Sequence, residues 1–133
     1  MPDASLFSHV TVGTNDLEHA KAFYDAVLEP LGGVQTFGSD VVAGYGLGQD
    51  GQTVFWVVLP FDRQVATVGN GTHIAFNAGT RASVDAFHAS ALAKGGADEG
   101  PPGLRPHYHA DYYGAYVRDL DGNKLQAVCH TPE

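Results

Sequence analysis

The chain has 133 residues, of which 44% are hydrophobic and 17% are charged, and this balance predicts one globular domain with its own core. Fifteen acidic residues against seven basic ones give a net charge of −8, which repels phosphate backbones and anionic lipid surfaces. We therefore expect neither nucleic acid nor a membrane as a partner. Because no apolar run approaches the roughly 20 residues of a membrane span and no secretory signal is visible, a cytoplasmic location is predicted.

Two helices are expected from apolar residues that recur at helical spacing. The first covers residues 16–31, with Asn15 as its N-cap and Pro30 loosening its last turn. The second covers residues 81–94, with Thr80 as its N-cap and a glycine pair directly after its last turn. The buried stripe of the second helix is expected to contain Val84, Phe87, His88, Ala91 and Leu92.

The other segments alternate between apolar and polar residues or are rich in β-branched residues, which predicts strands. The stretch of residues 100–111 begins with Gly-Pro-Pro-Gly and is expected to form a loop or an irregular strand edge. Turn signals, including one at residues 49–51, separate the strands. The expected strands cover residues 6–13, 33–37, 41–47, 53–59, 72–78, 112–118 and 124–130.

The chain contains an internal repeat. A shift of 64 residues places His9 on His73 and Phe23 on Phe87, and a looser echo relates residues 50–55 to residues 121–126. We predict an α+β fold in which two tandem βαβββ modules, about residues 5–62 and 70–131, form one domain over residues 1–133. In this prediction one curled mixed sheet surrounds a central cavity, and the helices lie outside.

Strand parity places three polar side chains on the predicted cavity face, each on a different strand. They are His9, His73 and Gln126, and the two histidines occupy equivalent positions of the repeat. Two imidazoles and an amide oxygen would suit a divalent ion such as Zn, Ni, Fe or Mn. The alternative is that each histidine is a hydrogen-bonded interior residue that binds no metal.

The tandem modules and two motifs resemble the vicinal oxygen chelate superfamily over nearly the whole chain. One motif begins at His9 and continues Val-Thr-Val-Gly-Thr-Asn-Asp-Leu, with Ala-Phe-Tyr at residues 22–24. The other is Val-Arg-Asp-Leu-Asp-Gly-Asn-Lys-Leu-Gln at residues 117–126. The superfamily includes glyoxalase I, extradiol dioxygenases, fosfomycin-resistance enzymes and bleomycin-binding proteins. The resemblance implies the predicted fold, a small-molecule substrate or ligand, and a homodimer.

The resemblance also implies metal positions, residue by residue. The superfamily's ligands on the first strand, on the strand opening the second module and on the last strand match His9, His73 and Gln126. The last ligand is usually a glutamate, and glyoxalase I has a further glutamate where this chain has Phe55 or Trp56. Glutamine can bind a metal through its carbonyl, but it is neutral and cannot act as a base. A standard glyoxalase I or extradiol dioxygenase is therefore disfavoured, and a divalent metal is expected to be held weakly or not at all.

Other residues are candidates for proton transfer and substrate binding. His107 and His109 share one face of an extended segment and could move a proton at the cavity mouth, unless the segment is an exposed loop. Aromatic side chains could line a pocket for the substrate or could belong to the core. An anionic substrate could be bound by Arg105 or Arg118, although an ion pair with the acids of the adjacent turn is the simpler role for Arg118. The substrate-binding candidates are Phe55, Trp56, Arg105, Tyr113 and Tyr116.

Two functions of different classes follow from these residues, with a weaker third. The first is a glyoxalase-like, metal-dependent lyase or isomerase that acts on a small oxygen-bearing substrate, with His107 or His109 as the proton shuttle. The second is a non-enzymatic small-molecule binder of the bleomycin-resistance kind, which the missing carboxylates favour. The third is an oxygenase that uses weakly held Fe(II).

Overall fold

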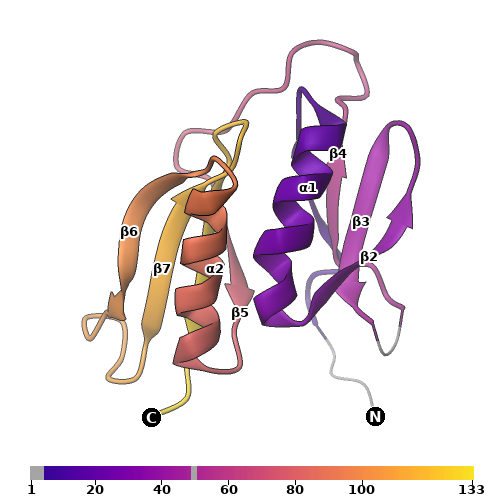
Figure 1. The fold of residues 1–133 in the computed structure, drawn as a ribbon. Helices are drawn as coiled ribbons and strands as arrows, with labels where there is room; N and C mark the ends of the chain where they lie inside the picture. Colours follow the sequence, from indigo (N-terminus) through magenta and orange to yellow (C-terminus); the bar gives the residue numbers. More distant parts are fainter. Residues whose placement is uncertain (1–4, 49–50) are drawn as a thin grey trace.

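The computed structural model describes residues 5–48 and 51–133 and contains two βαβββ modules in tandem, as predicted (Figure 1). Residues 49 and 50 lie outside the described residues; both belong to the turn signal predicted at residues 49–51, and residue 50 is the first of the echo. The first module consists of β1 (Val10–Gly13), α1 (Leu17–Leu28), the 3₁₀ turn η1 (Glu29–Leu31), β2 (Gly33–Gly38), β3 (Val42–Leu47) and β4 (Phe55–Val58). The second consists of β5 (His73–Asn77), α2 (Arg81–Ala93), β6 (Ala97–Leu104), β7 (Tyr113–Arg118) and β8 (Lys124–Cys129).

Each module forms its own four-stranded mixed sheet, and the two sheets have equivalent strand orders. Sheet A has the order β1-β4-β3-β2 and sheet B the order β5-β8-β7-β6. In both sheets the first and last strands of the module pair in parallel, and the remaining pairs are antiparallel. The predicted α+β class and tandem modules are confirmed, while within this chain the two sheets are not closed into one curled sheet.

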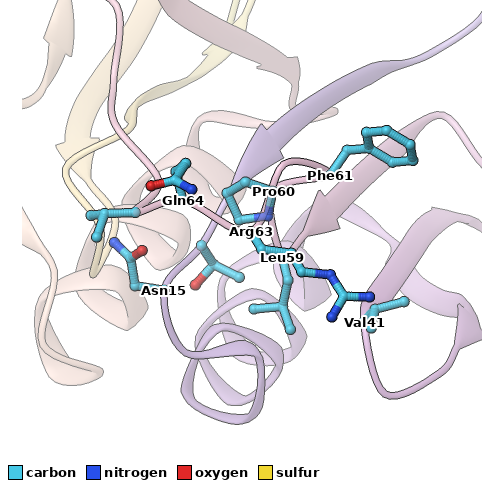
Figure 2. A pocket seen from close by; sticks show the side chains of 9 residues that line it. Asn15, Val41, Leu59, Pro60, Phe61, Arg63 and Gln64 are labelled. Carbon is cyan, nitrogen blue, oxygen red and sulfur yellow. The ribbon is translucent and has the colours of Figure 1, made fainter.

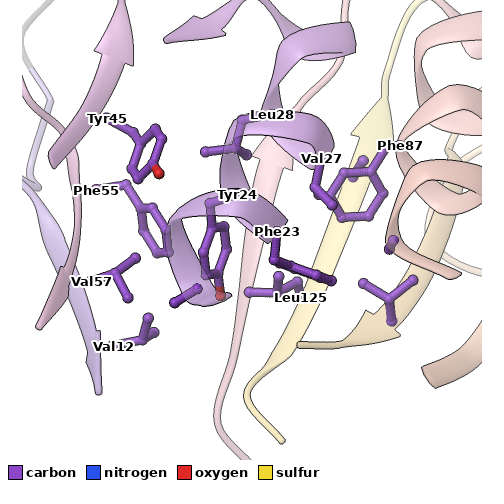
Figure 3. Close-up of a cluster of buried hydrophobic side chains, with 14 of the residues drawn as sticks. Val12, Phe23, Tyr24, Val27, Leu28, Tyr45, Phe55, Val57, Phe87 and Leu125 are labelled. Carbon is purple, nitrogen blue, oxygen red and sulfur yellow. The ribbon is translucent and has the colours of Figure 1, made fainter. Parts of the chain in front are cut away.

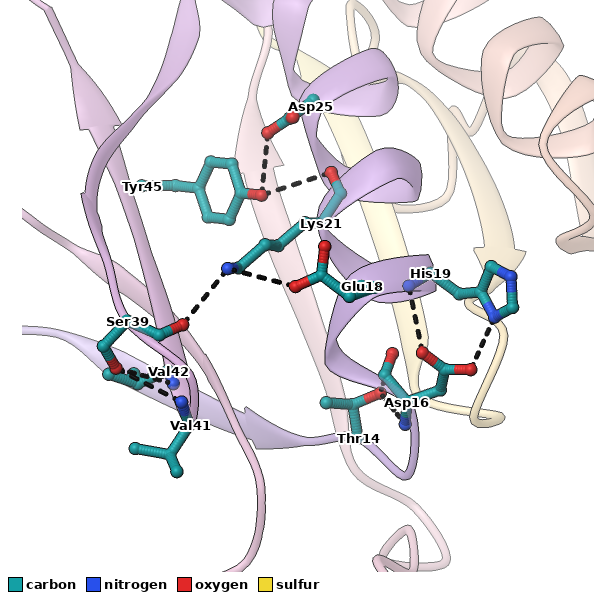
Figure 4. A network of polar contacts seen from close by, with 10 residues as sticks. All are labelled: Thr14, Asp16, Glu18, His19, Lys21, Asp25, Ser39, Val41, Val42 and Tyr45. Carbon is teal, nitrogen blue, oxygen red and sulfur yellow. Dashed lines mark hydrogen bonds and ion pairs between the residues drawn. The ribbon is translucent and has the colours of Figure 1, made fainter.

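Most predicted helix ends are confirmed, and one cap is corrected. Thr80 caps α2 by accepting a hydrogen bond from the Ser83 amide, and Pro30 lies in the 3₁₀ turn that ends the first helical segment. The N-cap of α1 is Asp16, whose carboxylate accepts from the His19 amide at 3.1 Å (Figure 4). Asn15 is not the cap because its side chain is bonded instead to the backbone of Ala66.

The stretch predicted as a loop or irregular strand edge begins within a strand. Residues 97–104 form β6, the edge strand of sheet B, and its register against β7 shifts on both sides of Gly100. In α2, the predicted stripe is correct for Val84, Phe87 and Ala91, but Leu92 is 41% exposed. No helix in the described ranges is long and apolar enough to span a membrane.

The two helices lie side by side, one against each sheet, and a single core contains both helices and the helix-facing residues of both sheets (Figures 1 and 3). A run of aromatic rings crosses from one module to the other. The Tyr24 ring lies 5.0 Å from Phe55, Phe55 lies 5.2 Å from Phe76, and Phe76 lies 6.4 Å from Phe87. We call the face of each sheet that is turned away from the helices its outer face.

A buried carboxylate joins the modules at the other end of this core. Asp119, in the β7–β8 turn, is 6% exposed and accepts a 2.5 Å hydrogen bond from the Tyr24 hydroxyl of α1. Its other oxygen accepts from the amides of Asp121 and Asn123. The Asn123 side chain in turn donates to the Gly13 carbonyl at 3.1 Å. Burial and the adjacent Asp119 carboxylate raise the pKa of Tyr24, so its hydroxyl stays protonated and donates.

The substitution Tyr24→Phe is expected to lower the free energy of unfolding by about 1–3 kcal/mol, because it removes one partner of a buried carboxylate. Urea denaturation of the two proteins measures the difference. Tyr45→Phe is the matched control, since its hydroxyl donates to Asp25, an exposed residue that water can solvate (Figure 4). Equal losses in the two variants would contradict the role of Asp119 as the junction.

Candidate functional site

The outer face of sheet B gathers most of the predicted site residues. In β8, Leu125, Ala127 and Cys129 face α2 and are fully buried in the core. Alternation along the strand therefore turns Lys124 and Gln126 to the outer face, as the sequence predicted. The small residues Ala75 and Gly114 lie on the same face next to Gln126, and the side chains of Gln126 and Tyr112 pack over Gly114.

His73 and Gln126 lie close together on this face. Gln126 pairs with Ala75 of β5 on one side and with Tyr116 of β7 on the other. His73 lies two residues before Ala75 on β5, so it is the diagonal neighbour of Gln126 on the same face. The His73 ring makes an edge contact with the Tyr116 ring at 5.9 Å. Gln126 is 1% exposed, and its Nε2 donates to the Tyr112 hydroxyl. Its carbonyl oxygen is consequently the atom that could bind a metal or ligand.

Tyr116 occupies the centre of the face. Burial, followed by hydrogen bonding with Tyr108, raises the pKa of Tyr116 to about 12. Its phenol is therefore neutral at physiological pH and can donate a hydrogen bond. The rings of Tyr108 and Tyr112 lie 4.8 Å apart, so three tyrosines lie together beside Gln126.

The histidines of residues 107–109 lie next to these tyrosines. His109 makes an edge contact with the Tyr112 ring at 5.4 Å, and its Nε2 lies 2.9 Å from Nδ1 of His130. Because Nδ1 of His109 accepts from the Asp111 amide, the neutral His109 ring carries its proton on Nε2 and donates to His130. The His107 ring lies tilted against the Tyr108 ring, with 4.3 Å between their centres. Both His107 and His109 are exposed, and only His109 contacts the tyrosine that holds Gln126.

His9 lies on the other sheet. It directly precedes β1, is exposed, and its Nδ1 lies 2.8 Å from the Ser8 hydroxyl. Among the described residues, no hydrogen bond or ring contact joins His9 to His73 or Gln126, and no group of three His, Cys, Asp or Glu side chains could hold a metal. A single chain therefore supplies His73 and Gln126 as a pair and His9 as a separate ligand, an incomplete fit to a metal ion.

The register of the sheets identifies the residue equivalent to Gln126 in the first module. Trp56 pairs with Thr11, two residues after His9, as Gln126 pairs with Ala75, two residues after His73. Of the two candidates Phe55 and Trp56, Trp56 is therefore the equivalent of Gln126; it lies on the outer face of sheet A, and its ring contacts Phe37 at 5.8 Å.

The structure corrects the roles predicted for three residues. Phe55 is 2% exposed and packs in the core between Tyr24 and Phe76, on the helix side of sheet A. Tyr113 donates to Asp85 of α2, also on the helix side. The ion pair expected between Arg118 and the acids of its turn is wrong, because Arg118 binds Glu99 at 3.4 Å instead.

A groove that the sequence did not indicate lies on the first module (Figure 2). It has a volume of about 620 Å³ and is formed by the end of β4, the following segment and the residues after β1. Its wall includes Leu59, Phe61 and Arg63, and Phe61 is fully exposed. None of the predicted site residues lines this groove.

Comparisons with known proteins agree with this architecture. The model of the Glyoxalase/Bleomycin resistance protein/Dioxygenase superfamily matches residues 6–127. A glyoxalase/bleomycin resistance protein from Albidiferax ferrireducens is 42% identical, with a TM-score of 0.85 and coverage of 96% of this chain and 100% of that chain. Among proteins with curated functions, none matches the sequence.

Two more distant crystal structures share the fold. The fosfomycin resistance protein FosX from Listeria monocytogenes is 19% identical, with a TM-score of 0.67 and coverage of 97% of this chain and 96% of that chain. Lactoylglutathione lyase from Agrobacterium tumefaciens is 22% identical, with a TM-score of 0.64 and coverage of 96% and 95%. Since the family model spans nearly the whole chain and both motifs and fold agree with it, this chain belongs to the Glyoxalase/Bleomycin resistance protein/Dioxygenase superfamily.

Proposed function

We propose that the protein is a glyoxalase-like, metal-dependent lyase or isomerase of the cytoplasm that acts on a small oxygen-bearing substrate. The observation that carries the proposal is that His73 and Gln126 lie on adjacent strands of one sheet face, each next to Tyr116. A divalent Zn, Ni, Fe or Mn ion, when bound, supplies Lewis-acid polarisation of a substrate oxygen. His73 through its imidazole and Gln126 through Oε1 are the ligands, with His9 as the third.

A homodimer would bring the third ligand to the other two. The outer face of sheet A exposes His9 and Thr11 and leaves Phe37 50% exposed beside the half-buried Trp56. Apolar area of this kind gains free energy when a second sheet covers it. If the outer face of sheet B from a second copy packs against this surface, His9 of one chain meets His73 and Gln126 of the other. Trp56 then lines the closed cavity against the substrate.

Proton transfer falls to His109. Gln126 is neutral and cannot take a proton, so the role of the usual glutamate needs another group. His109 shares a proton with His130 and contacts Tyr112, which binds Gln126. An imidazole can act as a general acid or base near neutral pH. His107, whose ring contacts Tyr108, is the second candidate.

A non-enzymatic binder of small molecules is the other candidate function. Two observations favour it: a neutral glutamine and a tryptophan occupy the positions of the two carboxylates, and three tyrosines lie together beside Gln126. Aromatic side chains with a small number of placed polar groups are typical of small-molecule sites, and binding by them needs no carboxylate.

Metal content tests the first proposal. Protein purified gently without a tag or chelator, then dialysed against Zn, Ni or Fe(II), is expected to carry near-stoichiometric metal. His73→Ala and His9→Ala are expected to lose it, because each removes an imidazole ligand. Elemental analysis measures the metal, and His19→Ala is the matched control, since that side chain is 76% exposed on α1 and bonded to Asp16.

Metal that His73→Ala retains would contradict the site assignment. A wild-type protein that stays empty after dialysis, together with ligand-induced thermal shifts that persist in EDTA, would overturn the lyase and favour the binder.

The substitution Gln126→Glu tests whether the neutral Gln126 limits the affinity for metal. A carboxylate adds the missing charge, so the affinity for Zn or Ni is expected to rise about tenfold or more. The metal-free variant is expected to lose about 1–3 kcal/mol of unfolding free energy, because the new carboxylate is buried. Isothermal titration and urea denaturation measure the two effects. Gln35→Glu makes the same change at an exposed position of β2 and should alter neither. An unchanged metal affinity in Gln126→Glu would place the metal elsewhere.

A further inference from the structure

Two cationic side chains of sheet B lie over one aromatic ring. The Arg105 guanidinium carbon is 5.8 Å from the centre of the Tyr116 ring, and the Lys124 ammonium nitrogen is 5.2 Å from it. Neither forms an ion pair with any carboxylate of the described residues. The same Tyr116 ring contacts His73, and Tyr116 pairs with Gln126 on the adjacent strand.

The backbone around Arg105 is shaped to hold it. The guanidinium donates to the Gly103 carbonyl at 2.9 Å and to the Pro101 carbonyl at 2.8 Å. A Cβ at Gly103 would stand 3.2 Å from Nη1, and one at Gly100 would stand 3.2 Å from the Tyr116 ring. The Gly-Pro-Pro-Gly stretch therefore leaves room for the arginine and fixes its position over Tyr116, with donors left for a further partner.

The cross-strand neighbours of Lys124 make its position electrostatically unfavourable for a cation. Its direct cross-strand neighbours are His73 on one side and Arg118 on the other. Like charges placed directly opposite in a sheet are destabilising. Of Arg118, Lys124 and His73, only Arg118 has a carboxylate partner among the described residues, Glu99 at 3.4 Å. The π-face of Tyr116 offsets part of this cost.

The scarcity of bases makes this placement informative. The chain has fifteen acids and seven bases. Lys21 and Arg81 lie within 3.5 and 3.9 Å of a carboxylate, and Arg63 and Lys94 are exposed to solvent. Arg105 and Lys124 instead are partly buried together on the face of the candidate site. An anionic ligand would neutralise both charges where no side chain does.

We infer that Arg105 and Lys124 bind an oxyanion, a carboxylate or phosphate-type group, at one end of the small molecule that this site takes. Arg105 supplies a fixed fork of donors and Lys124 a mobile point charge. The bound anion then directs the rest of the molecule across Tyr116 toward Gln126 and His73. This inference rests on the proposed function only in placing the ligand at the same face, and it holds for an enzyme or for a binder.

Anion titration in EDTA tests the inference without metal. Oxalate and inorganic phosphate are the probes for the carboxylate and phosphate classes, at constant ionic strength with chloride as the competing background. Saturable binding of one or both is expected by isothermal titration and by shifts of the amide signals of Gly100, Gly103 and Tyr116. The stronger probe identifies the class.

Matched variants separate this site from a general charge effect. Lys124→Gln is expected to weaken binding about tenfold, as one charge-assisted contact would. Lys94→Gln removes the same charge at the exposed end of α2 and should change binding less than about twofold. Arg105→Lys keeps the charge and loses the fork, and is expected to fall between wild type and Arg105→Gln.

Three results would overturn the inference: no saturable binding of either anion to the wild type, full binding by Lys124→Gln and Arg105→Gln, or an equal loss in Lys94→Gln. If Arg105→Gln does not fold, the Lys124→Gln and Lys94→Gln pair decides. Because EDTA removes any metal, this titration tests the anion site alone, and the metal analysis described above tests the lyase. Anion binding by a protein that takes up no metal in that analysis would support the anion site and refute the metal-dependent lyase. Metal uptake without anion binding would support the metal site and refute the anion site.

Discussion

The hydrogen bond between the Tyr24 hydroxyl and the Asp119 carboxylate is the constraint on which the arrangement of the two modules depends. One partner lies on the first helix and the other in the last turn, 95 residues later. Asp119 also accepts from the amides of Asp121 and Asn123 in its own turn, so Tyr24 is the donor that comes from the other module. Loss of that donor from a buried carboxylate costs about 1–3 kcal/mol, and this free energy favours the orientation in which the modules meet. Asn123, which binds both Asp119 and the Gly13 carbonyl, extends the junction to the end of β1.

This junction determines which surfaces remain for function. With both helices in one central core, the helix sides of both sheets are used for stability, and Phe55 and Tyr113 are committed there. The outer faces are left, and the two faces carry different chemistry. Sheet A offers a histidine, a threonine and an aromatic pair, and sheet B offers His73, Gln126, three tyrosines and two cations without an ion pair among the described residues. The homodimer proposed above is the arrangement that would combine residues of the two faces.

Gln126 and Trp56 are not carboxylates, and this limits what the proposed site can do. A glutamate would bind a cation strongly and accept a proton, whereas the glutamine contributes only a neutral oxygen and uses its amide to hold Tyr112. Positive charge is at the same time concentrated over Tyr116, so the face is better suited to an anion than to a cation held by protein ligands alone. A negatively charged substrate would supply the charge that the side chains lack and would help to hold a metal.

The sequence by itself determined the two modules, both helices and the parity of the strands, because hydrophobic periodicity and capping are local properties. It therefore correctly placed Gln126 and Lys124 opposite the buried Leu125 and Ala127. Only the tertiary structure decided the rest, because it depends on residues far apart in the chain. Asn15 is bonded to Ala66 and is no cap, Arg118 pairs with Glu99, and Arg105 is held over Tyr116. The separation of His9 from His73 has the same origin, since packing between the modules, and not the symmetry of the repeat, decides which outer faces meet.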